Sequence, residues 1–303
     1  MTFTTSLKEE ISQQNLNMEE SRIALESFIK FSGKIGKEIV LTMENGAVAR
    51  KIYKEIKKVY DIIPLITIRN QKRFRVKQIY ILTIKEKIDF IKDDIDIRYP
   101  ISELTSDEEK VSFLRGAFLA VGNISNPQTS GYHLEFICSN MKLAKEVKCL
   151  LDFFNFEAKI ITRGYKNVVY LKSSENISDL LKLFKATNAL FFFEDIRIYR
   201  DHKNMVNRLN NCEISNQTKA IATGLKQLEM INYINNHHLS DLLDDKCKIV
   251  MEAREKYPES SLTELAEIIT MEYNYRIGKS GVNHHFIKIS NLVKRHKNNN
   301  ENK

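Results

Sequence analysis

The spacing of apolar residues predicts the same series of elements twice along the first part of the chain. Apolar positions recur every three to four residues over 18–32 and again near 107–121, and a glycine closes each run. Each predicted helix is followed by a strand, a second helix and two further strands. We expect these strands over 38–43, 65–69, 78–84, 132–138, 158–163 and 167–172, and the second helices over 47–59 and 141–154.

The two leading helices also align residue by residue. Leu25–Gly33 corresponds to Leu114–Gly122 at an offset of 89 residues. An offset shared by a whole series of elements indicates an internal duplication. Small residues at Gly116, Ala117 and Ala120 would allow a neighbouring backbone to approach closely, so we predict that these two helices pack against each other.

After residue 178 the pattern becomes helical. A polar helix expected over 194–213 places Asn204, Asn207 and Arg208 on one face. Because asparagine is a poor helix former, this stripe needs an explanation. Contact with phosphates or with a neighbouring domain is one, and a solvated connecting helix is the other. A further helix is expected over 219–235.

The last part of the chain, from about residue 239, reads as three helices. The first is closed by Tyr257-Pro258, and Ser261 with Glu264 three residues later is a capping box for the second. After a turn containing Gly278, a last helix begins near Lys279 with Ser280 as its cap. A capped short helix, a turn and a helix with exposed polar groups are typical of a helix-turn-helix. The alternative interpretation is an ordinary three-helix bundle.

Two features of the last helix pair favour DNA as its partner. A helix N-terminus and lysine side chains bind phosphates, and the Asn283 amide can pair with adenine in the major groove. The adjacent His284 and His285 have a spacing unsuited to a helical zinc pair, and we expect both to point outward. The candidate DNA-binding residues are Ser261, Thr263, Lys279, Ser280, Asn283, His284, His285, Lys288, Lys294 and Arg295.

The charge of the chain points the same way. The net charge is +8 and the sequence pI is near 9.1, and residues 279–303 carry six Lys/Arg against one acid, a net of +5. A second basic cluster spans Arg69–Lys77, where a solvated hairpin tip is an equally good interpretation. The candidates for secondary DNA contacts are Arg69, Lys72, Arg73, Arg75, Lys77, Asn204, Asn207 and Arg208.

Composition excludes several other classes of protein. No apolar run approaches the ~20 residues of a membrane span, and no signal peptide is recognisable at the N-terminus. The four cysteines are far apart and have no histidine at zinc spacing, so we expect reduced, mostly packed thiols and neither metal nor cofactor. No glycine-rich phosphate cradle is present in the sequence. We therefore expect a cytoplasmic, nucleoid-associated protein.

The paired helices and the strands that follow them resemble the LAGLIDADG fold of homing endonucleases. The resemblance implies that each motif helix of the active nucleases ends with an acidic metal ligand. In this chain those positions are Ser32 and Val121. Because Mg²⁺ needs carboxylate oxygens, the resemblance implies a fold that does not cut DNA.

The predicted fold class is α+β, with a pseudo-two-fold LAGLIDADG-like domain of two αββαββ-type repeats followed by an all-α helix-turn-helix domain. The expected domains are repeats over 1–100 and 101–190, a helical linker over 191–238, the helix-turn-helix over 239–297 and a disordered tail over 298–303.

Nearly the whole chain resembles the WhiA family of regulators. The motifs that carry the resemblance are Phe113–Ala120, Ser125–Pro127, Tyr132–Glu135, Val169–Lys172, Asn204–Arg208, Asn211–Glu213 and Lys279–His284. The resemblance implies a non-catalytic, DNA-binding transcriptional regulator linked to cell division and chromosome segregation, and to sporulation in some relatives. Double-stranded DNA is the expected partner, with proteins of transcription or cell division as further candidates. The chain departs from the family at Val121, Gly278 and His285, where Gly, Ser and Arg are usual.

Two other functions remain open at this stage. An active endonuclease could use carboxylates away from the motif ends, and the nearby acids are Glu44, Glu135 and the Asp89–Asp96 group. A protein-interaction adaptor would use the helix-turn-helix only as a structural element. Cleavage in the presence of Mg²⁺ or Mn²⁺ would identify the first, and a lack of DNA binding at low salt would indicate the second.

Overall fold

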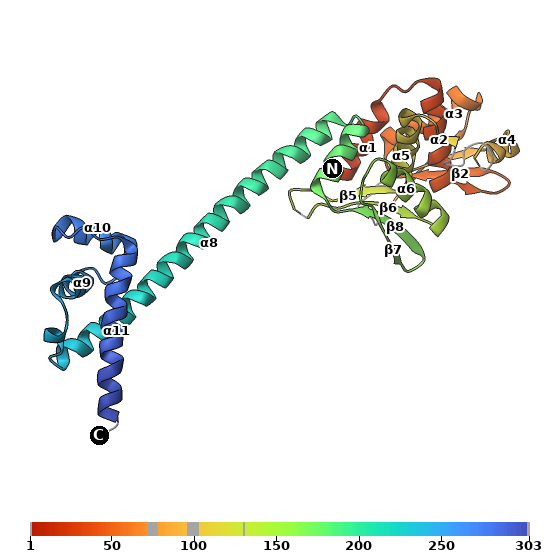
Figure 1. The fold of residues 1–303 in the computed structure, drawn as a ribbon. Helices are drawn as coiled ribbons and strands as arrows, with labels where there is room; N and C mark the ends of the chain where they lie inside the picture. Colours follow the sequence, from red (N-terminus) through yellow and green to blue (C-terminus); the bar gives the residue numbers. More distant parts are fainter. Residues whose placement is uncertain (1, 72–77, 96–102, 130, 302–303) are drawn as a thin grey trace. The chain divides into compact units, whose positions relative to one another are not determined.

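The protein folds into two compact units, residues 1–200 and 201–303 (Figure 1). The computed structural model describes residues 2–71, 78–95, 103–129 and 131–301. Two repeats of the same α–β–β–α–β–β series form most of the first unit. The first repeat is α2 (Met18–Ser32), β1 (Lys34–Ile35), β2 (Ile39–Met43), α3 (Gly46–Tyr60), β3 (Leu65–Asn70) and β4 (Gln78–Ile84). The second repeat is α5 (Asp107–Val121), β5 (Gly122–Ile124), β6 (Leu134–Cys138), α6 (Met141–Phe153), β7 (Lys159–Arg163) and β8 (Lys166–Leu171).

The two sheets have the same topology, which confirms the predicted duplication. Their strand orders are β1-β2-β4-β3 and β5-β6-β8-β7, and all pairs are antiparallel. The register agrees as well, because Ile35 pairs with Ile39 in the first sheet and Ile124 pairs with Leu134 in the second. Ile39 and Leu134 are both buried at equivalent positions, whereas Ile35 is 44% exposed and its equivalent Ile124 is buried.

Helices α2 and α5 pack tightly against each other, as the small residues predicted. A Cβ on Gly116 would stand 2.1 Å from the carbonyl oxygen of Ala24, so only glycine fits at this crossing. The Ser27 hydroxyl donates a hydrogen bond of 2.7 Å to the carbonyl oxygen of Phe113 across the same contact. Both helices begin with a capping box, Asn17 with Glu20 for α2 and a serine–glutamate pair for α5.

Short helices complete the first unit. These are α1 (Phe3–Gln13), α4 (Ile88–Asp93) and α7 (Ser174–Leu183). The long helix α8 (Thr187–Asn236) follows, and the boundary between the units falls inside it. Two helices were expected over 194–213 and 219–235 in a helical linker. The residues between them continue the helix, because no proline or glycine interrupts residues 187–223.

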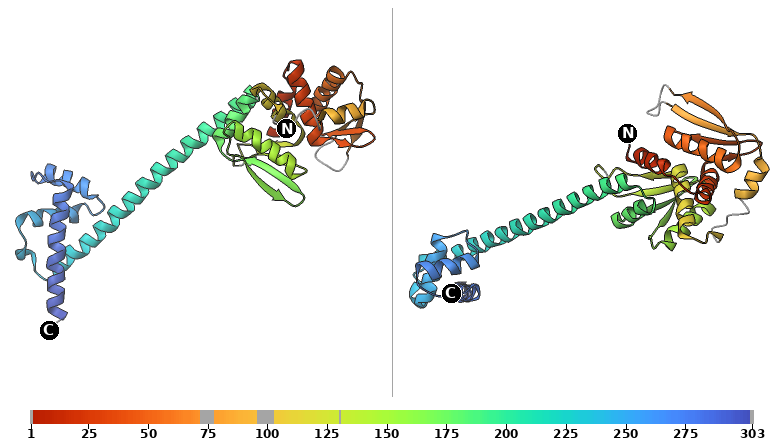
Figure 2. Two further views of the ribbon diagram at one scale, coloured as in Figure 1. Left: turned by 45° about the vertical axis from the view of Figure 1, so that its right-hand side comes forward. Right: turned by 90° about the horizontal axis from the view of Figure 1, so that it is seen from above.

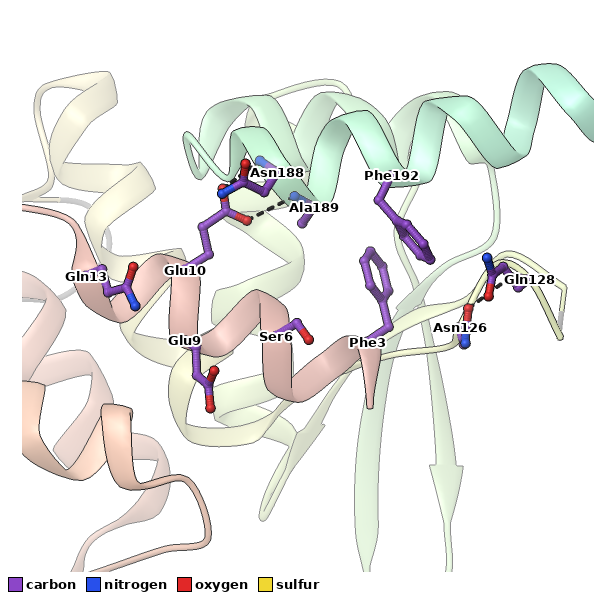
Figure 3. A pocket seen from close by; sticks show the side chains of 10 residues that line it. All are labelled: Phe3, Ser6, Glu9, Glu10, Gln13, Asn126, Gln128, Asn188, Ala189 and Phe192. Atoms are coloured by element: carbon purple, nitrogen blue, oxygen red, sulfur yellow. Dashed lines mark hydrogen bonds between the residues drawn. The ribbon is translucent and has the colours of Figure 1, made fainter. Parts of the chain in front are cut away.

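The start of α8 is fixed by a carboxylate from α1. Glu10 accepts hydrogen bonds from the backbone N–H groups of Asn188 at 2.7 Å and Ala189 at 2.9 Å (Figure 3). These N–H groups have no partner within the helix, so the glutamate replaces a capping residue. The rings of Phe3 and Phe192 pack nearby, tilted by 38° with their centroids 5.2 Å apart. These five residues line part of the adjoining cleft of about 510 Å³.

The second unit packs the end of α8 against a short 3₁₀ turn and three helices, with an apolar core of its own. The elements are η3 (Ser240–Leu242), α9 (Asp245–Lys256), α10 (Leu262–Glu272) and α11 (Lys279–Glu301), and α11 contacts both α9 and α10 (Figure 2). Val282, Phe286, Ile289 and Val293 form a buried stripe along α11.

Two expectations about the ends of α11 are wrong. The helix already begins at Lys279, with the Gly278 carbonyl accepting from the N–H of Val282, so Ser280 lies in the first turn and is not the cap. The helix also continues through residues 298–301, where a disordered tail was expected. The run of Asn at 298–300 disfavours a helix by propensity alone, but here it extends one that is already formed.

Two further expectations concern membrane-spanning helices and the cysteines. Among the described residues, no helix is both long and apolar enough to cross a bilayer. All four cysteines have free thiols, and Cys138 and Cys247 are buried as predicted. Cys149 and Cys212 are exposed, so the expectation of mostly packed thiols holds for only half of them.

Candidate nucleic-acid interface

Helices α10 and α11 form the predicted helix-turn-helix. Ser261 is the N-cap of α10, and its hydroxyl accepts from the N–H of Glu264 at 3.2 Å while the Glu264 carboxylate accepts from the N–H of Ser261 at 2.7 Å. The backbone hydrogen bond from Ser261 lowers the pKa of Glu264, so the capping carboxylate is ionised. Thr263 is exposed in the first turn of α10.

The outward face of α11 carries most of the predicted DNA contacts. Ser280, His284 and Arg295 are exposed on the side of the helix opposite its buried stripe, and Asn283 and Lys294 are exposed beside them. Lys279 is exposed in the first turn of the helix. The same face contains two residues that the sequence analysis did not select, Ile287, which is 50% exposed, and Asn291. Helical periodicity from Asn283 would have found both.

His285 does not point outward as expected. It is buried, with Nδ1 3.3 Å from the Cys247 sulfur and Nε2 3.3 Å from the Tyr275 hydroxyl. Burial lowers the pKa of His285, which keeps its ring neutral at pH 7. The residue falls on the side of α11 that faces α9, and the prediction of a DNA contact at His285 is therefore wrong.

Lys288 is exposed, but its ammonium group forms an ion pair with the Asp244 carboxylate. Its ammonium lies 3.1 Å from Asp244 Oδ2, and this hydrogen bond raises the pKa of Lys288. The other carboxylate oxygen of Asp244 accepts from the N–H of Cys247 and caps α9. Lys288 is consequently a weaker candidate for phosphate contact than Lys279 or Lys294.

The secondary candidates are placed only in part. Arg69 is exposed near the end of β3, while Lys72, Arg73, Arg75 and Lys77 lie outside the described residues. On α8, Asn204, Asn207 and Arg208 are all exposed within the second unit. Their exposure agrees equally with phosphate contact and with a solvated helix.

The ends of α2 and α5 carry no carboxylate. Ser32 and Val121 are the last residues of these helices, and the Ser32 hydroxyl is occupied by a hydrogen bond of 2.7 Å to the carbonyl oxygen of Phe28. A hydroxyl in use and an alkyl group offer a divalent cation no charged ligand.

Glu135 is held in a polar network and has no symmetric partner. Its carboxylate accepts from Asn123 at 3.2 Å and lies 3.1 Å from His133 and 3.4 Å from Arg163. Burial opposes ionisation of Glu135, but the hydrogen bonds from Asn123 and His133 outweigh it and lower its pKa. In the first sheet the strand pairing places Val40 at the equivalent position. The duplicated fold thus supplies one carboxylate here, where a paired site would need two.

The remaining nominated acids are dispersed. Glu44 is exposed beside the start of α3. Asp89 pairs with Lys92 at 3.5 Å, whereas Asp94 is buried and accepts from Arg22 at 2.8 Å. The last member of the group, Asp96, lies outside the described residues.

This architecture defines a duplicated LAGLIDADG-like domain joined to a helix-turn-helix domain. The domain matches follow the same order along the chain. Residues 18–98 match the WhiA N-terminal LAGLIDADG-like domain, residues 110–203 the WhiA LAGLIDADG-like domain and residues 206–293 the WhiA C-terminal HTH domain. The chain belongs to the WhiA family.

Individual relatives support the same assignment over nearly the full length. A protein of Bacillus cereus (strain AH187), named probable cell division protein WhiA, is 36% identical over 312 residues that cover 97% of each chain. The crystal structure of full-length WhiA from Thermatoga maritima has a TM-score of 0.58 at 24% identity, covering 97% of this chain and 99% of that one. A crystal structure of a WhiA N-terminal LAGLIDADG domain has a TM-score of 0.50 at 27% identity, covering 60% and 92%.

Proposed function

We propose that this protein binds double-stranded DNA through its helix-turn-helix without cutting it, and that it regulates transcription in cell division and chromosome segregation. The outward face of α11 is the observation that carries the proposal. It combines cations, amides and one apolar side chain on a helix whose opposite side is packed. The cations neutralise phosphates, Asn283 and Asn291 can pair with base edges, and Ile287 can contact a thymine methyl group. The protein would then act in the cytoplasm, at the nucleoid.

The non-catalytic part of the proposal rests on the motif ends. Phosphodiester cleavage assisted by metal needs carboxylates that hold the cation beside the scissile phosphate. Ser32 and Val121 supply none, and Glu135 faces its own hydrogen-bond donors. The part in cell division is supported by the name of the Bacillus cereus relative, which is that of a probable cell division protein.

A salt series on the full-length protein tests DNA binding. We expect affinity for duplex DNA to fall steeply with salt concentration, because each phosphate contact releases counterions. Lys279→Ala and Lys294→Ala should each lower the slope of the log of the binding constant against the log of the salt concentration by about 1. Lys248→Ala is the matched control, since Lys248 is exposed on α9 in the same unit.

Three results would count against the proposal. Binding that does not change between these variants and the control would place the DNA surface elsewhere. No binding at low salt would favour a protein-interaction adaptor. Nicking of supercoiled plasmid with Mg²⁺ or Mn²⁺, lost on Glu135→Gln, would show an active nuclease.

A further inference from the structure

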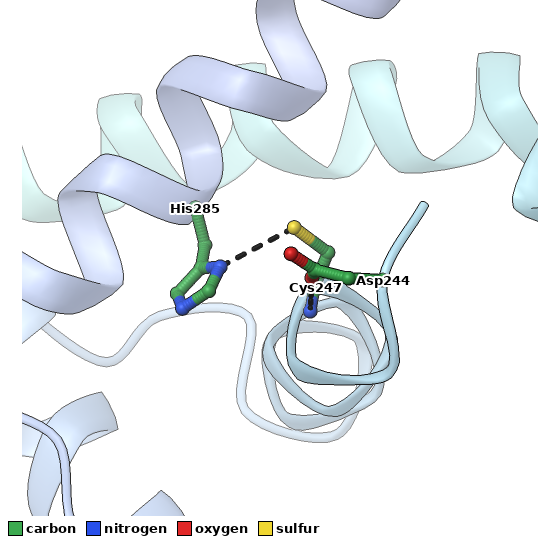
Figure 4. A group of neighbouring side chains, drawn as sticks. All are labelled: Asp244, Cys247 and His285. Atoms are coloured by element: carbon green, nitrogen blue, oxygen red, sulfur yellow. Dashed lines mark hydrogen bonds between the residues drawn. The ribbon is translucent and has the colours of Figure 1, made fainter. Parts of the chain in front are cut away.

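Three side chains of the second unit bring a carboxylate, a thiol and an imidazole together. The possible ligand atoms of Asp244, Cys247 and His285 all lie within 4.8 Å of one another (Figure 4). Cys247 and His285 are buried and Asp244 is exposed, so one side of the group is open to solvent. We propose that this group binds a Zn²⁺ ion through the Cys247 thiolate, His285 Nδ1 and a carboxylate oxygen of Asp244, with water as the fourth ligand.

The distance between the thiol and the imidazole suits a zinc ion with little rearrangement. Zn–S bonds of about 2.3 Å and Zn–N bonds of about 2.1 Å at a tetrahedral angle place the sulfur and nitrogen about 3.6 Å apart. The Cys247 sulfur and His285 Nδ1 are 3.3 Å apart, so the two groups need to separate by only a few tenths of an ångström. Sulfur and nitrogen ligands favour zinc over magnesium or calcium, which take oxygen ligands.

The imidazole is oriented by a second group. Tyr275 places its hydroxyl 3.3 Å from His285 Nε2, on the side of the ring away from the thiol. Histidine ligands commonly use the other ring nitrogen in this way, which fixes the ring and the position of its proton. With the proton on Nε2, the lone pair of Nδ1 faces Cys247. Burial lowers the pKa of His285, so no proton has to be removed from the ring at neutral pH.

Metal binding requires two exchanges at the other ligands. The Cys247 S–H bond breaks, its proton passes to solvent and the sulfur lone pair forms the bond to zinc. Burial raises the pKa of Cys247 to about 12, so the proton leaves only when the metal replaces it. Asp244 Oδ2 gives up the ammonium of Lys288, now 3.1 Å away, while its other oxygen keeps the N–H of Cys247 and the cap of α9.

The ion would join two helices of the helix-turn-helix unit. Asp244 and Cys247 stand at the start of α9 and His285 lies in α11. No metal was expected from the sequence, because a cysteine and a histidine 38 residues apart form no recognisable motif. The binding itself requires no DNA, so it can be tested independently of the proposed function.

Cobalt is the probe, because Co²⁺ occupies zinc sites and reports thiolate ligation by its charge-transfer absorption. We expect reduced full-length protein to show a thiolate-to-cobalt band that Zn²⁺ abolishes by displacement. Cys247→Ser should lose this band, whereas Cys149→Ser and Cys212→Ser, which alter the exposed thiols, should keep it. Tyr275→Phe should weaken metal binding by about 10-fold.

Lys288→Met separates a metal site from a hydrogen-bonded cluster. Removing the ammonium that competes for Asp244 Oδ2 should tighten Co²⁺ and Zn²⁺ binding. Zinc should also raise the unfolding temperature of the wild type more than that of Cys247→Ser. The absence of a thiolate band in the wild type, or a band that survives Cys247→Ser, would overturn the proposal.

Discussion

The carbonyl oxygen of Ala24 lies 2.1 Å from the position that a Cβ on Gly116 would occupy. This contact is where the two repeats meet, and the hydrogen bond from Ser27 to the Phe113 carbonyl oxygen lies beside it. A side chain at residue 116 would have to push the backbone of α2 away and lengthen that hydrogen bond. Residue 116 therefore sets how closely the two repeats approach.

Gly116→Ala should destabilise the first unit by about 3 kcal/mol, the upper end of the usual cost of overpacking. The clash is with backbone, which cannot rotate away as a side chain would. Denaturant unfolding measures the change. Gly131→Ala is the control, because a Cβ there meets nothing within 4 Å. Equal stability of the two variants would show that α2 and α5 can separate without cost.

Arg254→Met should destabilise the second unit by roughly 2–5 kcal/mol. The Arg254 guanidinium is buried and donates to the carbonyl oxygens of Tyr257, Pro258 and Ser260 at 3.2, 3.3 and 2.6 Å. Methionine fills the space but donates to none of these carbonyls, and within the described part of the chain only that of Tyr257 keeps another donor, the N–H of Ser260 at 3.4 Å. The free energy of unfolding of the variant should be compared with that of Arg276→Met, which alters an exposed arginine of the same unit. A loss no greater than the control's would mean that water replaces the guanidinium.

Stability should fall as the pH rises from about 4.5 to about 7, through the titration of Glu26. Burial raises the pKa of Glu26 from 4.5 to about 7. Arg22, 2.9 Å away, opposes this shift, but its guanidinium also forms an ion pair with the buried carboxylate of Asp94. Because the folded pKa exceeds the unfolded one, the folded state binds the proton more tightly between these values. The loss should be on the order of 2–3 kcal/mol across that window.

Glu26→Gln provides the matching variant, since its amide remains neutral at every pH. The free energy of unfolding, measured by urea titration from pH 4.5 to pH 8, should vary less with pH in this variant than in the wild type. Glu157→Gln, at an exposed position between α6 and β7, should keep the wild-type profile. Parallel profiles for Glu26→Gln and wild type would assign the pH dependence to other groups.

Asn283→Ala should cost about 1–3 kcal/mol of binding to the preferred DNA sequence and little on unrelated DNA. The Asn283 amide is exposed in the first turns of α11, so the substitution removes a donor and an acceptor without disturbing the core. Competition binding with specific and unrelated duplexes measures the ratio. An equal loss on both duplexes would assign Asn283 to the phosphates, whose contacts do not distinguish sequences.

Most of the fold could be predicted because its signals are local. The period of the apolar residues locates the predicted helices and strands of the two repeats to within two residues, and the capping box of Ser261 locates the start of α10. The duplication then follows from repetition, and the small residues of α5 indicate the helix pair. What the sequence did not show is the continuity of α8, since separate helices were predicted over 194–213 and 219–235 and a single helix joins them through residues 214–218.

The site was harder to predict, because it depends on which neighbour each side chain meets. His285 is one residue from the exposed His284, and only the packing of α11 on α9 decides that it is buried. The pairing of Lys288 with Asp244 joins residues 44 positions apart. Glu10 capping α8 joins residues even farther apart in sequence. Periodicity cannot reveal such long-range pairs.

The strand order also has a consequence for how the protein behaves in concentrated solution. In this order β3 is an edge strand of the first sheet. All six of its residues are exposed, and the exposed fractions are 57% for Leu65, 48% for Ile66 and 55% for Ile68. An apolar end strand is a template onto which a strand of another copy can add, and charges such as Arg69 oppose this addition. We expect aggregation during heating or concentration to begin at β3, and a lysine in place of Ile66 to delay it.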